Sequence, residues 1–548
     1  MSTIPHRLHE LVEAGPNREA IRLVALDGSQ TVLTRADLLG AAGAAAAELD
    51  IRRGDLVILV QQDLHTLAAT FFGVMLAGGI PSILPFATEK LHPDRYRSSM
   101  EALLTIAQPA LLATDPEVAD DVRGLLPDGN DLPLRVLDRT EGAAGVADPG
   151  AAAEDTALLQ HSSGTTGLQK GVMLSHRQIL DHVAAYGQAV DFTAEDVIVS
   201  WLPLYHDMGL IAGFLMPVLG GARLVLMSPF DWVRDPGMLL RAISEQGGTL
   251  CWLPNFAYNF LAGKVRDTDG LDLASMRAFV NCSEPVYAAS HRQFAERFAE
   301  QGVTPDMLTA SYAMAETVFG VTQSPVGQPA RTVWVDRRSL REDDTLVPAQ
   351  PGPASEELVS SGPPIPGVEV RVVDAGFNPL PDGRVGDILV RSQTMFSGYY
   401  NRPDATSGAF REGWYQTGDR GCIHEGEVIV LGRKKDLIIV GGKNVYPSDL
   451  ERLVNTVEGV HPGRAVAFGV ANPRSGTEDV VIVAETNTAD PDERKQIAAA
   501  VRRAVAQGSD VAVRQVAVVD RDWLIKTSSG KISRSAAREK WLSGAGGS

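Results

Sequence analysis

The sequence has few cysteines, no long uninterrupted apolar run and no excess of positive charge, and each shortage excludes a class of protein. Its three cysteines, Cys251, Cys282 and Cys422, lie far apart in 548 residues without a C-x-x-C pair, so we expect no disulfide framework and predict a reducing, cytoplasmic location. The longest apolar stretch, 209–221, contains Pro217 and is too short to span a bilayer, so no integral membrane association is expected. The first residues carry no apolar signal-peptide core.

The formal net charge of −18 argues against nucleic-acid binding, because a phosphate backbone would be repelled. The charge is unevenly spread: from Arg433 to the end, 18 basic and 14 acidic residues give a net +4, so the remainder carries −22. A locally basic module suits an acidic or phosphate-bearing partner, although an ordinary solvated surface gives the same count.

Two common nucleotide-binding patterns are also absent. From Gly164 onward the G-x-x-x-x-G-K-[ST] spacing of a P-loop fails, and Lys170 is followed by Gly171. No G-x-G-x-x-G lies at a predicted strand-to-helix turn with the acidic residue of a dinucleotide site after it. A P-loop NTPase and a dehydrogenase are therefore not predicted.

What is present instead is a loop, residues 160–172, dense in hydroxyls and glycines and carrying one lysine, Lys170. Small residues let backbone amides approach a polyanion, hydroxyls add donors, and the lysine supplies the countercharge. A run of this kind is also common in plain surface loops, so its meaning depends on the rest of the chain. The residues expected to contact phosphate are Ser162, Ser163, Gly164, Thr165, Thr166 and Gly167.

The first half of the chain alternates helical patterns, such as 35–49, with short apolar runs, such as 56–60. This alternation is typical of strands joined by crossover helices and predicts a parallel-rich α/β fold. Residues 143–154 are rich in Ala and Gly and predict a loop before the strand that ends at the phosphate loop.

The second half has a different pattern. Residues 323–362 are polar and proline-rich, which predicts a surface insertion or linker. Residues 387–390 and 427–431 alternate around turns, as small antiparallel strands do. The segment after Gly432 has its own apolar runs, including 480–484, and we expect a separate small α+β domain.

Further clusters follow the phosphate loop in a set order, at residues 201–209, 311–317, 413–419, 432–444 and 526–532. Together they strongly resemble the adenylate-forming enzymes: acyl-CoA synthetases, luciferases, peptide-synthetase adenylation domains and fatty acyl-AMP ligases. The phrases at 203–210, 254–258 and 281–286 are most similar to the fatty acyl-AMP ligases. The long span between Glu316 and Gly362, which contains residues 333–340, is also similar to the fatty acyl-AMP ligases. In CoA ligases this span is usually shorter.

The resemblance implies an α/β fold with a large N-terminal lobe, residues 1–432, built of parallel-rich α/β sheet subdomains and a small β-barrel-like subdomain. The insertion falls at about 323–361 of the sequence. A hinge at 433–436, centred on Lys435, would join a small mobile α+β C-terminal domain, residues 437–548, whose swing separates the two half-reactions.

The reaction implied has two halves. A carboxylate attacks the α-phosphate of ATP to give acyl-AMP and pyrophosphate, and a thiol then attacks the mixed anhydride. The resemblance to fatty acyl-AMP ligases implies that the carboxylate belongs to a fatty acid. Because the first half joins two anions, catalysis must consist mainly of charge neutralisation and positioning. The insertion favours the phosphopantetheine thiol of an acyl carrier protein as acceptor, and an acyl-CoA ligase is the alternative. A non-catalytic adenylate-binding regulator would have lost Lys531, Glu316 or Asp419, and all three are present.

The resemblance implies a role for each residue that matches a position of the family's motifs. Lys170 would hold the β- and γ-phosphates, and Thr166 and Glu316 would bind Mg²⁺, a hard cation suited to oxygen ligands. Lys531, on the mobile domain, would bridge the α-phosphate and the attacking carboxylate. His206 would lie beside the acyl entrance and gate it or orient the carboxylate, although a buried structural histidine is the other interpretation.

Asp419 matches the aspartate that accepts hydrogen bonds from both ribose hydroxyls, and Arg433 matches the arginine that assists it. Tyr312 would pack against adenine. The other positions expected in the nucleotide pocket are Ser283, Glu284, Pro285, Ser311, Ala313, Met314 and Thr317.

The acyl pocket is expected from an apolar and partly aromatic set that suits an alkyl or aryl chain, although such residues are more often ordinary core. The set is Met208, Ile211, Phe214, Trp252, Phe256 and Tyr258. The basic C-terminal segment could meet an acidic carrier protein, through Arg502, Arg503, Arg514, Arg521, Arg534 and Arg538. CoA phosphates suit the same charges, and the sequence at 441–443 is compatible with CoA, so the acceptor stays open.

Overall fold

The structure, a computed structural model, describes most of the chain as two compact units. The large unit comprises Met1–Arg331, Ser361–Glu369 and Arg391–Gly413, and the small unit comprises Thr332–Ser360, Val370–Val390 and Trp414–Ser548. The described residues are 3–87, 93–126, 132–139, 150–161, 170–440, 443–472, 477–509, 511, 513–526 and 531–545.

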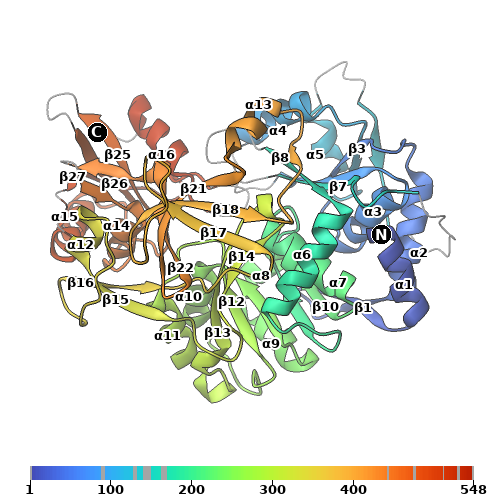
Figure 1. The fold of residues 1–548 in the computed structure, drawn as a ribbon, viewed down its shortest axis with the longest axis horizontal. Coiled ribbons are helices and arrows are strands. Elements are labelled where there is room, and N and C mark those ends of the chain that lie inside the picture. The colour runs from blue at the N-terminus through green and yellow to red at the C-terminus, as the bar shows by residue number, and fades with distance from the viewer. Residues whose placement is uncertain are drawn as a thin grey trace. The chain divides into compact units, whose positions relative to one another are not determined.

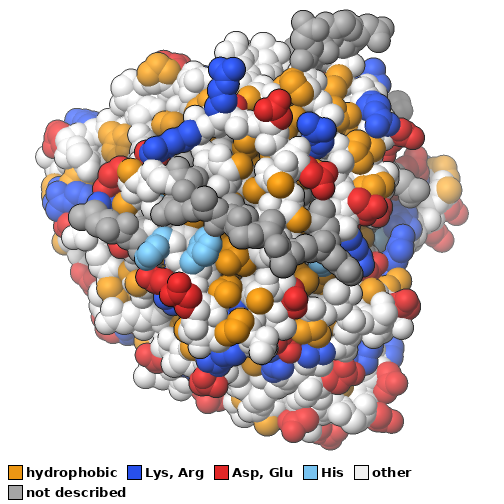
Figure 2. All heavy atoms as spheres, turned by 90° about the vertical axis from the view of Figure 1, so that its right-hand side faces the viewer, with side chains coloured by type: hydrophobic (Ala, Val, Ile, Leu, Met, Phe, Trp, Pro, Cys, Tyr) orange, Lys and Arg blue, Asp and Glu red, His pale blue; other side chains and the backbone are white. Residues whose placement is uncertain are grey.

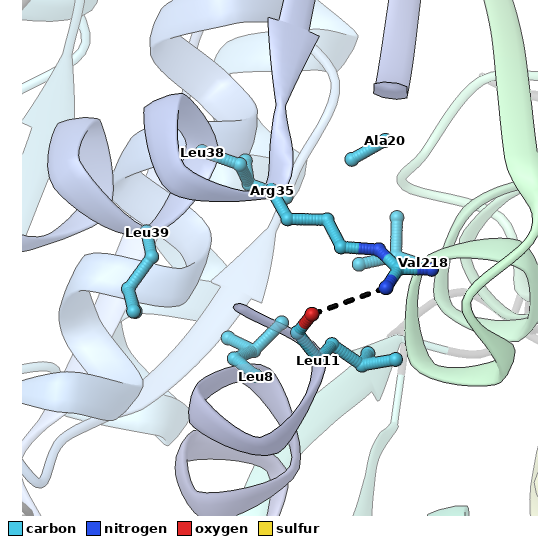
Figure 3. Close-up of a pocket in the computed structure, with 7 residues that line it drawn as sticks. All are labelled: Leu8, Leu11, Ala20, Arg35, Leu38, Leu39 and Val218. Carbon is cyan, nitrogen blue, oxygen red and sulfur yellow. Dashed lines mark hydrogen bonds between the residues drawn. The ribbon is translucent and has the colours of Figure 1, made fainter. Parts of the chain in front are cut away.

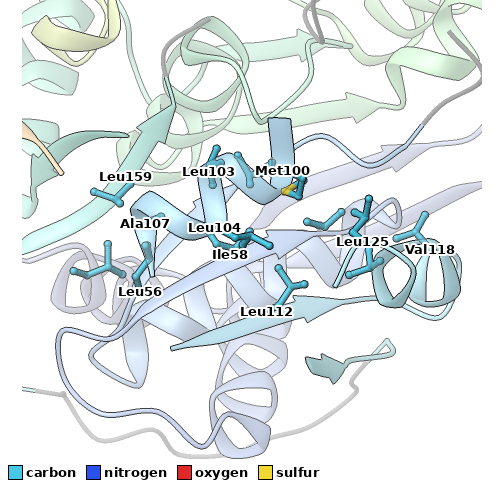
Figure 4. Close-up of a cluster of buried hydrophobic side chains, with 14 residues drawn as sticks. Leu56, Ile58, Met100, Leu103, Leu104, Ala107, Leu112, Val118, Leu125 and Leu159 are labelled. Carbon is cyan, nitrogen blue, oxygen red and sulfur yellow. The ribbon is translucent and has the colours of Figure 1, made fainter. Parts of the chain in front are cut away.

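One parallel sheet of the large unit is built from β3 (Leu56–Val60), α3 (Leu64–Leu76), β4 (Ile80–Ile83), α4 (Pro93–Ala107), β5 (Leu111–Thr114), α5 (Ala119–Arg123) and β6 (Leu134–Val136). Its strand order is β4-β3-β5-β6, and all the pairs are parallel. The strand predicted at 56–60 is confirmed, and all of its residues are buried. Because side chains alternate between faces, Leu56, Ile58 and Val60 point together into the core that includes residues of α4 and α5 (Figure 4).

The largest sheet and its helices comprise α1 (Ile4–Ala14), β1 (Glu19–Val24), β2 (Gln30–Thr34), α2 (Arg35–Glu48), β9 (Val197–Ser200), η1 (Met208–Leu215), α7 (Met216–Gly220), β10 (Arg223–Met227), α8 (Pro229–Arg234), α9 (Gly237–Gln246), β11 (Leu250–Leu253), α10 (Asn255–Lys264), β12 (Ala278–Asn281), α11 (Ala288–Arg297), η2 (Ala299–Gln301), η3 (Pro305–Met307), β13 (Leu308–Ala313), η4 (Ala315–Thr317) and β14 (Gly320–Gln323). The strand order is β14-β13-β12-β11-β9-β10-β1-β2. The inner pairs are parallel, whereas β2 and β14 pair antiparallel at the two edges. The predicted parallel-rich α/β fold is confirmed.

A third sheet flanks the predicted phosphate loop. It consists of β7 (Thr156–His161), β8 (Gly171–Ser175) and β19 (Gly398–Tyr399), and α6 (His176–Ala189), α13 (Pro403–Ala409) and β20 (Phe410–Arg411) belong to the same unit. Leu159 packs into the core of Figure 4, and the Ser82 hydroxyl donates to the Leu159 carbonyl at 3.0 Å. β7, the strand that precedes the predicted phosphate loop, is therefore anchored to the sheet that contains β4. A reciprocal capping box between Ser175 and Gln178 starts α6 directly after β8.

A buried arginine ties two helix ends together. Arg35 is 8% exposed and donates to the carbonyl of Leu11, in the last turn of α1, at 3.1 Å (Figure 3). It also donates to the carbonyl of Gly221, after α7, at 2.7 Å. Helix C-termini attract cations because their last carbonyls lack intrahelical partners. The adjoining cavity has a volume of about 10 Å³, room for about one water, so the arrangement is structural.

The small unit begins with β15 (Thr332–Asp336), α12 (Arg337–Glu342), β16 (Ser355–Val359), β17 (Val368–Val373), β18 (Gly386–Ser392), β21 (Trp414–His424) and β22 (Glu427–Arg433). β18 pairs antiparallel with β21 and β21 pairs antiparallel with β22, as the alternation of the sequence predicts. With β17 beside β18, this curled sheet forms the expected barrel-like subdomain as a half-barrel.

The proline-rich segment at 323–362 is not a linker, and that part of the prediction is wrong. β15 and β16 pair antiparallel, and Val335 and Leu340 are buried against Val385, Cys422 and Ile429 of the half-barrel. The prolines at 348, 351 and 353 fall between α12 and β16, where a missing N–H breaks no ladder, so they do not prevent a folded element.

The predicted C-terminal α+β domain is present within the small unit. Its elements are η5 (Lys434–Asp436), β23 (Ile438–Val440), β24 (Lys443–Val445), α14 (Pro447–Val454), β25 (Ala465–Asn472), β26 (Thr477–Glu485), α15 (Pro491–Gly508), β27 (Val513–Val519), α16 (Arg534–Lys540) and η6 (Trp541–Ala545). The apolar run at 480–484 is continuous because both faces of β26 are covered. Val480 and Ile482 pack with α14 and α15, whereas Val481 and Val483 pack with Ala537 of α16. Figure 1 labels these helices and the strands β25, β26 and β27 in its orange-to-red part.

The two compact units do not divide at residue 432, since the half-barrel and the C-terminal domain belong to one unit. The domain boundaries and the hinge at 433–436 stay predictions. No helix among the described residues is long and apolar enough to cross a membrane. On the face drawn in Figure 2, acidic and basic side chains are interspersed.

Replacing Arg534 by alanine is predicted to destabilise the small unit. Arg534 bridges Asp436, at 2.8 Å, and Glu451, at 2.9 Å, and all three side chains are at most a quarter exposed. Removing the cation leaves two carboxylates largely desolvated, so we expect a loss of about 2–3 kcal/mol in the free energy of unfolding. Chemical denaturation should show it, with exposed Arg503→Ala on α15 as the matched control; equal midpoints for both variants would contradict the bridge.

Candidate functional site

The parallel strands of the largest sheet bring several predicted site residues to one edge. Because β9, β11, β12 and β13 run parallel, the segments that follow them leave the sheet on the same side. His206 and Met208 follow β9, Phe256 follows β11, Ser283 follows β12, and Glu316 follows β13. Ligand crevices of α/β sheets form at this carboxyl edge, so the fold supports a common site.

Direct side-chain contacts join the segments that follow these strands. The Ser283 hydroxyl lies 3.7 Å from the Met208 sulfur, and the Glu284 carboxylate accepts from the Phe256 amide at 3.1 Å. Glu284 thus supplies an acceptor for the first turn of α10, which lacks a side-chain N-cap of its own. His206 Nδ1 lies 2.6 Å from Asp207 Oδ1, which fixes its imidazole beside the start of η1.

A second group of predicted residues converges on a tyrosine. Lys170 immediately precedes β8, and its ammonium nitrogen lies 4.5 Å from the centroid of the Tyr399 ring. The Tyr399 hydroxyl donates to Glu316 Oε1 at 2.8 Å. The structure therefore brings together the predicted phosphate lysine and the predicted metal carboxylate through one aromatic side chain.

Glu316 is presented on a strained turn. Two residues later, Val318 has φ 72° and ψ −54°, a region that a β-branched residue rarely occupies. The Thr317 hydroxyl donates to the carbonyls of Met314 and Phe319, and His182 Nε2 accepts from the Gly320 amide at 3.0 Å. These contacts hold the turn, and strain held in this way is typical of functional sites.

The donor set fits a magnesium ion bound partly by substrate. No group of three or more His, Cys, Asp or Glu side chains suited to a metal occurs among the described residues. Mg²⁺ usually takes one or two protein carboxylates together with phosphates and waters, so a single glutamate is sufficient protein chemistry. Glu316 offers a second carboxylate oxygen beyond the one that Tyr399 binds.

Asp419 and Arg433, predicted to act together on ribose, are direct cross-strand partners in β21 and β22. Arg433 Nε lies 3.4 Å from Asp419 Oδ1; the aspartate side chain is 11% exposed and the arginine 49%. An aspartate that is nearly buried yet paired to a half-exposed cation can accept hydrogen bonds from a ligand at the sheet surface.

Lys531 lies just before α16, next to an isolated β-bridge between Lys526 and Ile532. Ile532 packs against the core that contains Ala537, so the backbone around Lys531 is anchored on the C-terminal sheet. Lys435, the predicted hinge, is exposed in η5. Their catalytic and hinge roles stay predictions.

The phosphate-loop residues predicted to bind ATP and metal, Ser162 to Gly167, lie outside the described residues. Among the other predicted pocket residues, Ser311 is buried and donates to the Thr322 carbonyl at 2.8 Å, while Tyr312, Ala313 and Met314 are partly exposed. Thr317 is fully buried. Pro285 is exposed.

The predicted acyl residues fall into separate groups. Phe256 is 41% exposed and contacts the stacked pair Trp201 and Trp232. Met208 touches Ser283, as described above, and Ile211 is buried in the same helix. The remaining members are fully buried in other contacts: Phe214 with Phe71 and Phe72, Trp252 with Tyr186, and Tyr258 with His291 and Phe294.

One arginine of the predicted carrier-binding set is in the wrong place for that role. Arg534 is bound by Asp436 and Glu451, and its Nε also donates to the Ala467 carbonyl, so it is part of the domain's interior. Arg514 is paired with Asp479 at 3.3 Å. Arg502, Arg503, Arg521 and Arg538 are exposed.

Sequence reasoning missed two residues. Tyr399 lies far from Lys170 along the chain, and no spacing rule connects them. His182 lies on α6, where its position predicts only a buried helix face. For Tyr399 the sequence did contain a weak signal, the glycine that precedes it. Gly398 has φ 142°, which favours glycine, and a Cβ at this position would approach Thr406 to 3.0 Å.

Comparison with known proteins identifies relatives over the whole chain. The family model described as "AMP-binding enzyme" matches residues 8–400. The chain is 31% identical over 582 aligned positions to long-chain-fatty-acid–AMP ligase FadD26 of Mycobacterium marinum, covering 99% of this chain and 97% of that protein.

Solved structures give the same result. A structure from a study of fatty acyl-adenylate ligases of E. coli and L. pneumophila superposes with a TM-score of 0.90 at 25% identity, covering 100% of this chain and 98% of that one. An ATP-bound RpMatB-BxBclM chimera superposes with a TM-score of 0.75 at 25% identity, covering 98% and 99%.

Acidification is predicted to destabilise the large unit through its buried histidines. Burial lowers the pKa of His161 to about 4 and that of His182 to about 3, from 6.5. The unfolded chain therefore takes up protons first, so stability is full above pH 6.5 and is lost as pH falls towards 4, by up to about 1.4 kcal/mol per pH unit for each group.

Thermal unfolding between pH 7 and 4.5 measures this effect. His182→Gln keeps an acceptor for Gly320 and should show a shallower fall in Tm, whereas exposed His6→Gln should follow the wild type. Parallel curves for all three proteins would rule out His182 as a contributor.

Proposed function

Since the chain belongs to the AMP-binding family of adenylate-forming ligases, we propose that it activates a fatty acid as acyl-AMP and passes the acyl group to the phosphopantetheine thiol of an acyl carrier protein. Adenylation of an acid by ATP is the activity of the family. The substrate class, the acceptor and the residue roles are the proposal. The observation that carries it is the convergence of Lys170 and Glu316 on Tyr399, where Lys170 immediately follows in sequence the segment predicted to bind phosphate.

In the first half-reaction a carboxylate oxygen bonds to the α-phosphorus while the bond to the pyrophosphate oxygen breaks, and no net proton moves. Both reactants are anions, so cations must screen their approach. Lys170 would bind the outer phosphates. Glu316, with Thr166, would hold Mg²⁺, which when bound neutralises phosphate charge and orients the triphosphate.

Asp419 and Arg433 would hold the nucleoside. A carboxylate can accept from both ribose hydroxyls at once, and the Arg433 guanidinium, 3.4 Å from Asp419 Oδ1, would orient it. Lys531 would contribute the cation beside the α-phosphate, where charge grows in the transition state.

A fatty acid is supported by the residues that follow the parallel strands and by the relatives. Phe256, which follows β11, is 41% exposed and packs on the buried pair Trp201 and Trp232, and buried Met208 follows β9, so apolar and aromatic side chains gather after these strands. The FadD26 ligase is named for long-chain fatty acids. A carrier protein as acceptor is supported by the folded insertion and by exposed Arg502, Arg503, Arg521 and Arg538, which suit an acidic partner.

An acid panel tests the substrate and the acceptor. Purified protein with ATP, Mg²⁺ and short, medium and long fatty acids or aryl acids should release pyrophosphate, with the highest kcat/KM for one fatty chain length. Adding holo carrier protein should consume the acyl-AMP faster than CoA does. Preferential consumption by CoA would refute the carrier, and no pyrophosphate with any acid would refute the substrate class.

Lys531→Ala is predicted to slow adenylation about 100-fold or more, because it removes a cation from the transition state, while transfer from supplied acyl-AMP stays within about threefold of wild type. Pyrophosphate release and thioester formation are measured separately. Lys526→Ala, at the isolated bridge with Ile532, is the control and should retain adenylation. Equal losses in both half-reactions would contradict the role given to Lys531.

A further inference from the structure

We propose that Tyr399 is a positioning residue for the nucleotide site: its hydroxyl orients the Glu316 carboxylate towards the metal, and its ring face holds the Lys170 ammonium until triphosphate binds. This inference rests on the proposed function, because it assigns Glu316 and Lys170 to Mg²⁺ and phosphate. It concerns a residue that itself contacts neither reacting atom.

The contacts of Tyr399 use both of its chemical features. The phenol donates to Glu316 Oε1 at 2.8 Å, and the Lys170 nitrogen lies 4.5 Å from the ring centroid. Tyr399 is 5% exposed, so water competes little for either interaction. One side chain thus holds a carboxylate by its edge and an ammonium by its face.

The backbone around Tyr399 is fixed on both sides of the site. β19 pairs with β8, opposing Tyr399 to Val172, and the Tyr400 amide donates to the Gly171 carbonyl, next to Lys170, at 2.8 Å. The Phe396 amide donates to the Glu316 carbonyl at 2.8 Å. The Tyr399 amide itself donates to the Thr406 hydroxyl at 2.8 Å. The segment is therefore tied to both the lysine strand and the glutamate turn.

These contacts have a chemical consequence for the carboxylate. A donated hydrogen bond occupies one lone pair of Oε1 and orients the carboxylate plane, which leaves Oε2 for a hard cation. Without it, Glu316 would sample several rotamers before binding metal, and the entropy lost on binding would weaken metal affinity.

The ring face has a different consequence for the lysine. A cation above an aromatic ring is held by about 0.5–2 kcal/mol, much less than a triphosphate offers. Tyr399 therefore keeps the Lys170 ammonium in place, and no carboxylate in the described part of the chain forms an ion pair with it. The ammonium remains available for transfer to phosphate.

The test separates the hydroxyl from the ring. Tyr399→Phe keeps the ring and removes the donor, and Tyr399→Leu removes both. Wild type and variants are compared by pyrophosphate release against Mg²⁺ concentration at saturating ATP, by the KM for ATP at saturating Mg²⁺, and by calorimetric binding of ATP with and without Mg²⁺.

We expect Y399F to raise the half-saturating Mg²⁺ concentration about five- to tenfold, as loss of a hydrogen bond to a charged group does, with the KM for ATP changed less than about twofold. Y399L should raise both. In a Glu316→Gln background, adding Y399F should change the Mg²⁺ dependence less than about twofold, because the tyrosine acts through that carboxylate.

Tyr400→Phe is the matched control, an identical change one residue along, and should leave every value unchanged. An unaltered Mg²⁺ dependence in Y399F, or the same added effect in the E316Q background, would overturn the inference. Circular dichroism and Tm show whether each variant folds. If the wild type releases no pyrophosphate with any acid, the proposed function fails, while the calorimetric comparison of Y399F with wild type still decides the role of Tyr399.

Discussion

The parallel direction of the strands in the largest sheet is the constraint on which the candidate site depends. Each strand from β9 to β13 delivers the segment after it to the same edge, so residues up to 75 positions apart in the chain come into contact there. Ser283 reaches Met208 and Glu284 reaches the start of α10 for this reason. An antiparallel arrangement would distribute the same segments over two edges.

Electrostatics explains which kinds of side chain the proposed reaction needs. Two unit charges 4 Å apart interact by about 1 kcal/mol in water and about 4 kcal/mol at the effective dielectric of a protein surface. A carboxylate brought against a triphosphate meets several such repulsions, so cations have to be positioned beforehand. Among the residues proposed for this task, Lys170, Arg433 and Lys531 carry positive charge, whereas Glu316 is proposed to act through a bound Mg²⁺. Arg433 and Lys531 belong to the C-terminal segment, which has a net positive charge within an acidic protein.

Much of the fold was predictable from local pattern. Three predictions are confirmed: the strand at 56–60, the antiparallel strands near 388 and 429, and the continuous apolar run of β26. They succeed because alternation and burial of side chains set the spacing of apolar residues along a strand. For the insertion, the linker interpretation is wrong. The prolines indicate a linker in the sequence, and only the structure shows that they lie between α12 and β16 and leave the pairing of β15 with β16 intact. Arg534 was misjudged likewise: a basic residue in a basic segment gives no sign that two acids enclose it.

By itself the sequence determined the order of motifs, the absence of P-loop and dinucleotide patterns, and thereby the family, since these depend on residue type and spacing alone. Only the tertiary structure decided that Tyr399 links Lys170 to Glu316, that Asp419 faces Arg433 across two strands, and that the proposed acyl aromatics occupy separate groups. Strand pairing and packing bring together positions far apart in the chain, and no local pattern encodes the distance between such positions.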